Sequence, residues 1–124
     1  MIYLDTHAVA WLYQGLTRRF SGTARRSIER ETLAISPMVE LELSLLHEIG
    51  RIRPSPQTMI QVLEENFGLQ VCRLPFPQVI RAAGEERWTR DPFDRIIVAQ
   101  AKTNGAGLVT SDERILRNYN RAIW

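Results

Sequence analysis

Four short, mainly apolar segments, separated by longer stretches with helical periodicity, restrict the fold of this chain more than any other feature of its sequence. The segments are residues 2–4, 32–35, 69–74 and 108–110, and residues 122–124 form a candidate fifth strand at an edge. Strands this short and this apolar are buried on both faces. Because they alternate with helices, the sequence predicts an α/β fold in which a parallel sheet of four to five strands carries helices on both faces.

Caps, prolines and glycines mark the ends of the predicted helices. Ser36-Pro37 and Asp91-Pro92 each place a capping side chain before a proline at the first helical position. Thr6 is predicted to cap the first helix. The predicted helices span residues 6–13, 21–30, 37–49, 56–66, 78–86, 91–104 and 112–117. We find no repeat or linker, so residues 1–124 are expected to form a single domain.

The composition gives no sign of a membrane or secreted protein. No apolar run has the length of a membrane span, and Asp5 interrupts the first apolar run before a signal peptide is formed. Cys72 is the single cysteine, so it cannot form an internal disulfide and is expected to be a small core residue. We therefore expect a cytoplasmic protein without a membrane partner.

Aspartate is rare in this chain and falls at the ends of predicted elements. Ten of the fourteen acidic residues are glutamate, and the aspartates are Asp5, Asp91, Asp94 and Asp112. Asp5 follows the first strand and Asp112 lies two residues beyond the fourth, at the sheet edge where doubly wound folds bind ligands. As alternatives, Asp5 is a turn or capping residue, and Asp112 lies in a helix start capped by Thr110 and Glu113. Capping accounts fully for Asp91.

Glu42 interrupts an apolar helix face. At helical spacing its neighbours on that face are Met38, Val39, Leu45, Leu46 and Ile49. Glu40, on the polar face of the same helix, has no expected role. Because a lone buried carboxylate costs several kcal/mol, Glu42 is expected to bind a cation, with an ion pair to an arginine as the alternative.

Asp94 is the third residue of the helix that begins at Pro92. It heads an apolar row formed by Ile97, Val98 and Ala101, so it is expected to point inward at the sheet edge. The positive N-terminus of the helix is expected to keep its carboxylate ionised and available to a metal.

Taken together, Asp5, Glu42, Asp94 and Asp112 predict one metal centre. Four carboxylates that share a pocket repel each other strongly unless cations lie between them. Ligand sets made of oxygen alone, without a His or Cys cluster, favour Mg²⁺ or Mn²⁺ over zinc. One or two such ions support hydrolysis of a phosphodiester bond.

The basic residues are compatible with a nucleic-acid substrate. Fifteen of the sixteen are arginine, whose planar guanidinium binds phosphate through two hydrogen bonds. A GC-rich genome is the alternative explanation for this bias. The arginines that could form a rim for the RNA backbone are Arg18, Arg19, Arg25, Arg26, Arg51, Arg53, Arg87, Arg90 and Arg95. His7 either contacts substrate or is a packed or capping residue.

The sequence resembles the PIN-domain family, and within it the VapC-type toxins of bacterial toxin–antitoxin pairs. The resemblance covers nearly the whole chain. It rests on these segments: Tyr3-Leu4-Asp5-Thr6-His7-Ala8, Ile35-Ser36 to Glu42-Leu43, Arg90-Asp91-Pro92-Phe93-Asp94-Arg95 with the run to Ala99-Gln100-Ala101, and Leu108-Val109-Thr110-Ser111-Asp112. Relatives often carry an aromatic residue just before the second acid, whereas this chain has Leu41 before Glu42.

The resemblance implies a Rossmann-like sheet, Mg²⁺ or Mn²⁺ dependence and endoribonuclease activity. It assigns Asp5, Glu42, Asp94 and Asp112 as the four acids in order, with Asp5 and Asp94 most directly on the metal. It also implies inhibition by a cognate antitoxin, and homodimers are common in the family. Transfer, ribosomal and messenger RNA are all open as substrates.

Two alternatives remain beside the nuclease. A phosphotransfer or phosphatase domain also places acids at strand ends, but a haloacid-dehalogenase site needs an aspartate where His7 stands. A receiver needs a lysine at a late strand end, and Lys102 lies in the middle of a predicted helix. A binding module that has the same fold without catalysis is the second alternative.

Overall fold

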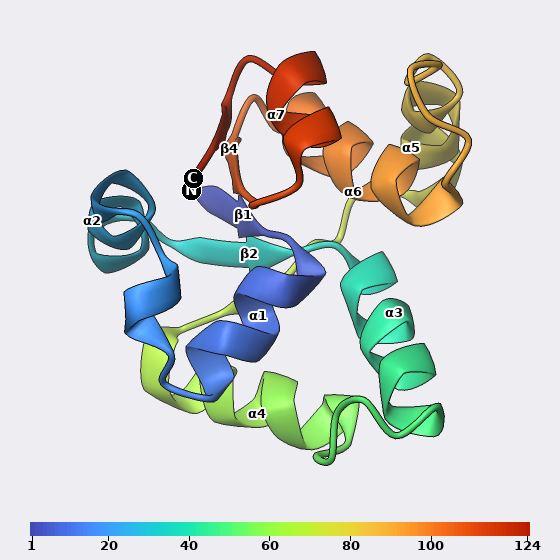
Figure 1. Cartoon of the computed structure of the whole chain (residues 1–124). Coiled ribbons are helices and arrows are strands. Elements are labelled where there is room, and N and C mark those ends of the chain that lie inside the picture. Colours follow the sequence, from blue (N-terminus) through green and yellow to red (C-terminus); the bar gives the residue numbers. More distant parts are fainter.

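The protein, described for all of residues 1–124 by a computed structural model, is built on five parallel strands (Figure 1). The strands are β1 (Ile2–Leu4), β2 (Leu33–Ile35), β3 (Gln70–Val71), β4 (Gly107–Val109) and β5 (Ala122–Ile123). Their order in the sheet is β3-β2-β1-β4-β5, and every neighbouring pair is parallel. The predicted α/β fold with a parallel sheet is confirmed.

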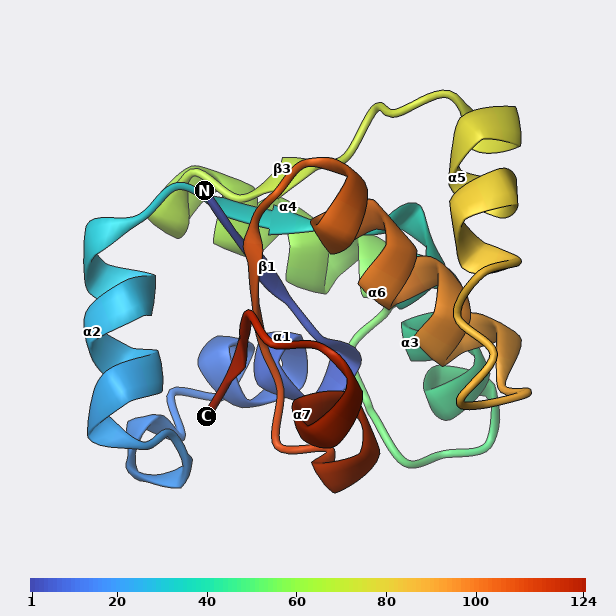
Figure 2. The ribbon, with the colours of Figure 1, turned by 90° about the horizontal axis from the view of Figure 1, so that it is seen from above.

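Seven helices connect and cover these strands. They are α1 (Thr6–Tyr13), α2 (Gly22–Arg30), α3 (Pro37–Glu48), α4 (Pro56–Phe67), α5 (Phe76–Ala83), α6 (Pro92–Thr103) and α7 (Glu113–Asn118), with a 3₁₀ turn η1 at Thr17–Arg19. In Figure 1, α1, α3 and α4 lie on one side of the sheet and α5, α6 and α7 on the other, and Figure 2 shows α2 beyond the sheet's amino end. None of the helices is both long and apolar enough to cross a membrane.

The central strands β1, β2 and β4 are short segments of the buried core, whereas the edge strands β3 and β5 are less buried. Ile2, Tyr3 and Leu4 of β1 are at most 2% exposed, and 27 buried side chains form one continuous cluster around the sheet. A three-residue strand covered on both faces needs apolar residues at successive positions, which is the pattern that the sequence shows. The apolar segments therefore predicted the sheet correctly.

Several predicted boundaries differ from the structure. β3 covers only residues 70–71 of the predicted 69–74, because the chain makes its last sheet hydrogen bond from the Cys72 N–H to the Ile35 carbonyl and then turns away toward Pro75. Helix α5 begins at Phe76, before the predicted residue 78, because Pro77 fits the first helical turn, where its missing N–H costs nothing.

Two helix caps also differ from the prediction. Asp5, not Thr6, caps α1: its side chain accepts a hydrogen bond from the Thr6 N–H. Asp112, not Thr110, caps α7, and it accepts from the N–H groups of Arg114 and Ile115. The strand order reverses between β1 and β4, so both caps lie at the point in the sheet where such folds open a ligand site.

Candidate active site

An open pocket of about 400 Å³ lies at the carboxyl edge of the sheet. Its eight lining residues are Asp5, His7, Trp11, Glu42, Asp91, Asp94, Ser111 and Asp112. All four acids predicted from the sequence are among them. The structure adds Trp11, Ser111 and a fifth carboxylate, Asp91, which was predicted to be a helix cap alone.

Asp5 is the most buried of these carboxylates, at 8% exposed. One of its oxygens accepts from the Thr6 N–H at 2.8 Å and the other from the Thr110 hydroxyl at 2.6 Å. Burial raises the pKa of Asp5, and these two hydrogen bonds oppose the rise. The Thr110 oxygen also accepts from the Asp112 N–H at 3.0 Å, so one hydroxyl connects the ends of β1 and β4.

Glu42 is half-buried and accepts a hydrogen bond from the Thr6 hydroxyl. No arginine forms an ion pair with it, so the arginine alternative finds no support. The prediction that Leu45 and Ile49 share its core-facing side was wrong, since they are 41% and 66% exposed. Glu42 therefore stands at the margin of the core, where burial still raises its pKa and the Thr6 hydroxyl opposes the rise.

Asp94 differs from the other carboxylates because it has no hydrogen-bond or ion-pair partner. Burial and then the charges of Asp91, Asp5, Asp112 and Glu42 raise its pKa to about 7. The prediction that the helix N-terminus keeps Asp94 ionised therefore finds no support. Asp91, and not Asp94, accepts the hydrogen bond from the Phe93 N–H, at 2.8 Å. For Asp94, burial and the repulsion from four nearby carboxylates outweigh the remaining attraction of the helix dipole.

Asp91 and Asp112 are helix caps that also face the pocket. Oδ1 of Asp91 accepts from the Phe93 N–H, and Oδ1 of Asp112 accepts from the N–H groups of Arg114 at 2.8 Å and Ile115 at 3.1 Å. The second oxygen of each carboxylate makes no hydrogen bond within the protein. Capping therefore leaves one oxygen of each carboxylate without a hydrogen bond, so capping and a role in the pocket are compatible.

The donor set suits a hard divalent cation in its chemistry. Five carboxylates supply oxygen ligands, which Mg²⁺ and Mn²⁺ prefer. As the side chains are arranged, however, no three acidic, His or Cys groups lie close enough to hold one ion together. Their hydrogen bonds to Thr6, Thr110 and the helix N-termini, and their mutual repulsion, favour this spread arrangement.

The family model for the PIN domain matches residues 2–121. The chain belongs to the PIN domain family. A search of curated proteins finds no match.

Solved toxin–antitoxin structures share the fold of this PIN domain. A chain of VapBC2 from Rickettsia felis, crystallised on a promoter DNA fragment, is 20% identical with a TM-score of 0.72, over 100% of this chain and 98% of that one. A chain of a toxin–antitoxin complex from Klebsiella pneumoniae is 14% identical with a TM-score of 0.68, over 100% of this chain and 97% of that one. A chain of DNA-bound VapBC from Salmonella typhimurium is 20% identical with a TM-score of 0.65, over 98% of this chain and 96% of that one.

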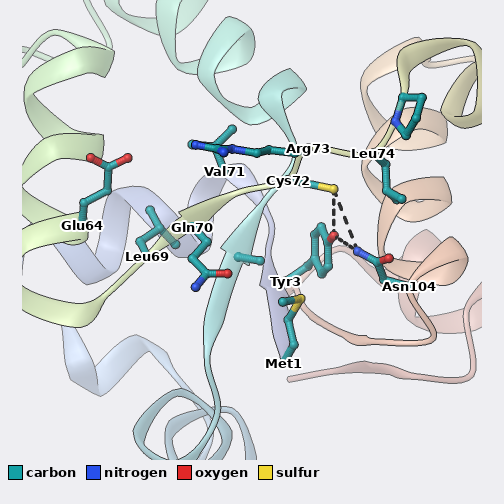
Figure 3. A pocket seen from close by; sticks show the side chains of 12 residues that line it. Met1, Tyr3, Glu64, Leu69, Gln70, Val71, Cys72, Arg73, Leu74 and Asn104 are labelled. Carbon is teal, nitrogen blue, oxygen red and sulfur yellow. Dashed lines mark hydrogen bonds between the residues drawn. The ribbon is translucent and has the colours of Figure 1, made fainter.

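A second, larger hollow of the PIN domain contains none of the predicted acids. It measures about 680 Å³ and lies beside β2 and β3 (Figure 3). On its wall the Tyr3 hydroxyl donates to the Cys72 sulfur at 3.0 Å and accepts from the Asn104 amide at 2.6 Å. Cys72 is half-buried at the rim of this hollow, so the expectation of a core cysteine holds only in part.

Proposed function

We propose that this PIN domain is a metal-dependent endoribonuclease that cleaves RNA phosphodiester bonds as the VapC-type toxin of a cytoplasmic toxin–antitoxin pair. Residues 1–124 would act as a single domain. The observation that carries the proposal is Asp94, a half-buried carboxylate without any partner that lies among four others. Such an arrangement destabilises the folded protein when no metal is bound, and a divalent cation offsets this destabilisation.

Asp5 and Asp94 are the groups that we assign to direct metal binding, with Glu42 and Asp112 completing the set. A bound Mg²⁺ or Mn²⁺ supplies positive charge for a phosphodiester under attack by water. Asp5 is held in place by hydrogen bonds from both Thr6 and Thr110, so its orientation is set before any ligand arrives. Glu42 is oriented by the Thr6 hydroxyl, which supports a role in positioning water or metal.

The decisive experiment measures RNA cleavage in Mn²⁺ by the wild type and by Asp5→Asn, Asp94→Asn and Glu42→Gln. We expect each substitution to reduce cleavage at least 100-fold, in line with the loss of a catalytic group. Glu40→Gln is the matched control, because Glu40 lies on the same helix and outside the pocket. Equal cleavage by all five proteins would refute the metal site, and no cleavage by any of them would favour the inactive binding module.

The phosphotransfer alternative receives no support from Lys102. Its Nζ donates to Glu86 at 2.9 Å, and Lys102 does not line the acid pocket. A receiver-type site requires a free lysine near its acids, so we retain the nuclease and the binding module as the two candidates.

A cognate antitoxin is the proposed protein partner. The similar structures from Rickettsia felis and Klebsiella pneumoniae are toxin–antitoxin complexes, which supports a partner of this type. The test is the neighbouring gene: a short reading frame directly upstream should encode a protein that co-purifies with this chain and inhibits its cleavage of RNA. Co-expression without complex formation would count against the assignment.

A homodimer is the second proposed assembly, and α3 offers the surface that favours it. Leu41, Leu45 and Ile49 follow each other at one-turn intervals and are 49%, 41% and 66% exposed. An exposed apolar row of this kind on a small protein marks an interaction surface. A second copy of the chain would cover it with the same row, as two-fold symmetry requires.

A further inference from the structure

Helix α1 carries two aromatic side chains on the face that begins at Asp5. His7 and Trp11 are one helical turn apart, both line the acid pocket, and their ring centroids lie 5.9 Å apart. His7 is exposed, whereas Trp11 is half-buried. One helix therefore holds a buried carboxylate at its cap and an aromatic wall beside it.

Trp11 packs against residues that are far apart in the sequence. Phe20 and Trp124 contact it edge to face, with centroids 6.3 Å and 5.4 Å from its ring. The Arg19 guanidinium lies over the indole, 5.3 Å from its centroid. Stacking on an aromatic ring leaves the guanidinium N–H groups free at the edge, where they can bind phosphate.

The two rings are tilted by 49° to each other, so a planar base can stack on only one of them. We propose that the exposed ring of His7 stacks a base of the nucleotide next to the phosphodiester in the acid pocket, with Trp11 supporting that ring, and that Arg19 binds the following phosphate of the RNA. The inference rests on the proposed nuclease function and names the residues that would hold the base and the phosphate beside the cleaved bond.

The wall suits stacking because it is both accessible and rigid. His7 offers its exposed ring toward the pocket, and the cluster of Trp11, Phe20 and Trp124 holds the supporting ring in one position. Little side-chain freedom is then lost when a base binds. One stacked base typically strengthens binding about 5- to 150-fold, whichever base it is.

A purely structural role is the competing explanation for Trp11, because it joins α1 to the last residue, Trp124. His7 separates the two explanations. Its side chain is exposed, so its truncation removes the stacking surface without removing core packing.

The experiment compares two fluorescein-labelled hexamers by anisotropy: hexa-adenylate, and an abasic ribose-phosphate chain of equal charge. Binding is measured in Ca²⁺ with the integrity of each probe verified on a gel. We expect the wild type to bind hexa-adenylate at least fivefold more tightly than the abasic chain. In His7→Ala this ratio should fall below about two, while the melting temperature stays within about 2 °C of the wild type.

Arg19→Gln provides a second readout. It should weaken binding of both probes equally and make the dependence of log Kd on log salt shallower by about 0.7, the loss of one phosphate contact to a single strand. Arg30→Gln is the matched control, because this exposed arginine ends α2 just before the amino end of β2, at the opposite edge of the sheet. It should change neither quantity.

A wild-type ratio near one, no measurable binding of either probe, or a ratio unchanged in His7→Ala would overturn the inference. These outcomes are independent of cleavage. Metal-dependent cleavage with an affinity ratio of one would refute the stacking site and support the nuclease. A high affinity ratio without any cleavage would refute the nuclease and support a site that binds single strands.

Discussion

Replacing Asp94 by asparagine removes one charge from the acid pocket and keeps the size of the side chain. In the metal-free protein the pKa of Asp94 is raised from 3.8 to about 7, first by burial and then by the surrounding carboxylates. At 1.36 kcal/mol per unit, a shift of this size in a fully buried group would correspond to about 4 kcal/mol. Asp94 is only half-buried, and solvent screening reduces the expected cost of its charge to about 1–2 kcal/mol.

The sign of the effect follows from proton linkage. The native pKa of Asp94 lies above the unfolded value, so the native state holds the proton more tightly. Stability of the wild type therefore falls as the pH rises from about 4 through about 7. Asparagine does not titrate, and the variant lacks this loss. At pH 8 in EDTA we expect the Asp94→Asn protein to be more stable by about 1–2 kcal/mol, or about 4–8 °C in Tm for a chain of this length.

The assay is thermal unfolding of both proteins at several pH values between 5 and 8, in EDTA and again in Mn²⁺. The difference in stability between the two proteins should decrease toward pH 5. It should disappear in saturating Mn²⁺, because the wild type has the more complete ligand set and is stabilised more by the ion. Glu48→Gln removes an exposed charge from the end of α3 and should change stability by less than about 0.5 kcal/mol. The reasoning is refuted if the variant is less stable than the wild type at pH 8 in EDTA, or if the difference in stability does not change with pH.

Three further predictions concern other parts of the structure. Lys102→Met should lower the free energy of unfolding in urea by about 1–3 kcal/mol, because the Glu86 side chain is only 4% exposed and loses its cation, and a Glu86→Gln partner substitution should recover part of the loss. Thr110→Val removes the hydrogen bond to Asp5 and should weaken Mn²⁺ binding by calorimetry about 10- to 100-fold, whereas an unchanged affinity would show that Thr110 does not orient the ligand. Leu45→Glu should convert a homodimer to a monomer in light scattering, and a dimer that persists would place the interface elsewhere.

The centre of the sheet was predictable because β1, β2 and β4 are buried segments of the core. Each of these strands shows a short apolar run, and nothing further away in the sequence is needed to recognise it. Strand β3 was the least accurately predicted, since apolar residues of the segment 69–74 continue as far as Leu74, past the last sheet hydrogen bond at Cys72. Apolar character shows which residues are buried but does not show where the chain leaves the sheet.

The face of α3 was predicted less well than its boundaries. The periodicity of apolar residues allowed two neighbouring stripes, and Leu45 and Ile49 were assigned to the core although they are exposed. The buried stripe instead contains Val39 and Leu43. A surface reserved for another molecule is as apolar as a core, so a single sequence cannot distinguish the two.

The packing that supports the aromatic wall was missed because Phe20 and Trp124 are distant from Trp11 in sequence. Trp11 lies in the first helix, and its neighbours Phe20 and Trp124 meet it only after the chain folds. The one available signal was the spacing of His7 and Trp11, one turn apart on the helix that Asp5 caps.

The fold itself explains why acids gather at one place. Helices α1, α3, α6 and α7 all begin at the carboxyl edge of the sheet, and the reversal of strand order between β1 and β4 brings their N-termini around one pocket. Aspartate, asparagine and serine are preferred as caps at such N-termini, because their side-chain oxygens accept from free backbone N–H groups, and Ser36 caps α3 in this way. Asp5, Asp91 and Asp112 are each such a cap.

Convergent caps supply ligands at little cost, but they do not neutralise the pocket. Each cap uses its hydrogen bonds on its own helix, and the helix dipoles contribute only about 0.3–1 kcal/mol each. Asp94 is not a cap, receives no hydrogen bond and keeps a pKa near 7 despite its place in the first turn of α6. The caps therefore follow from the architecture, whereas Asp94 has no structural reason to be acidic. A carboxylate that costs stability at this position is best explained by a cation that binds there, which is why the stability of Asp94→Asn, with and without Mn²⁺, tests the proposed function directly.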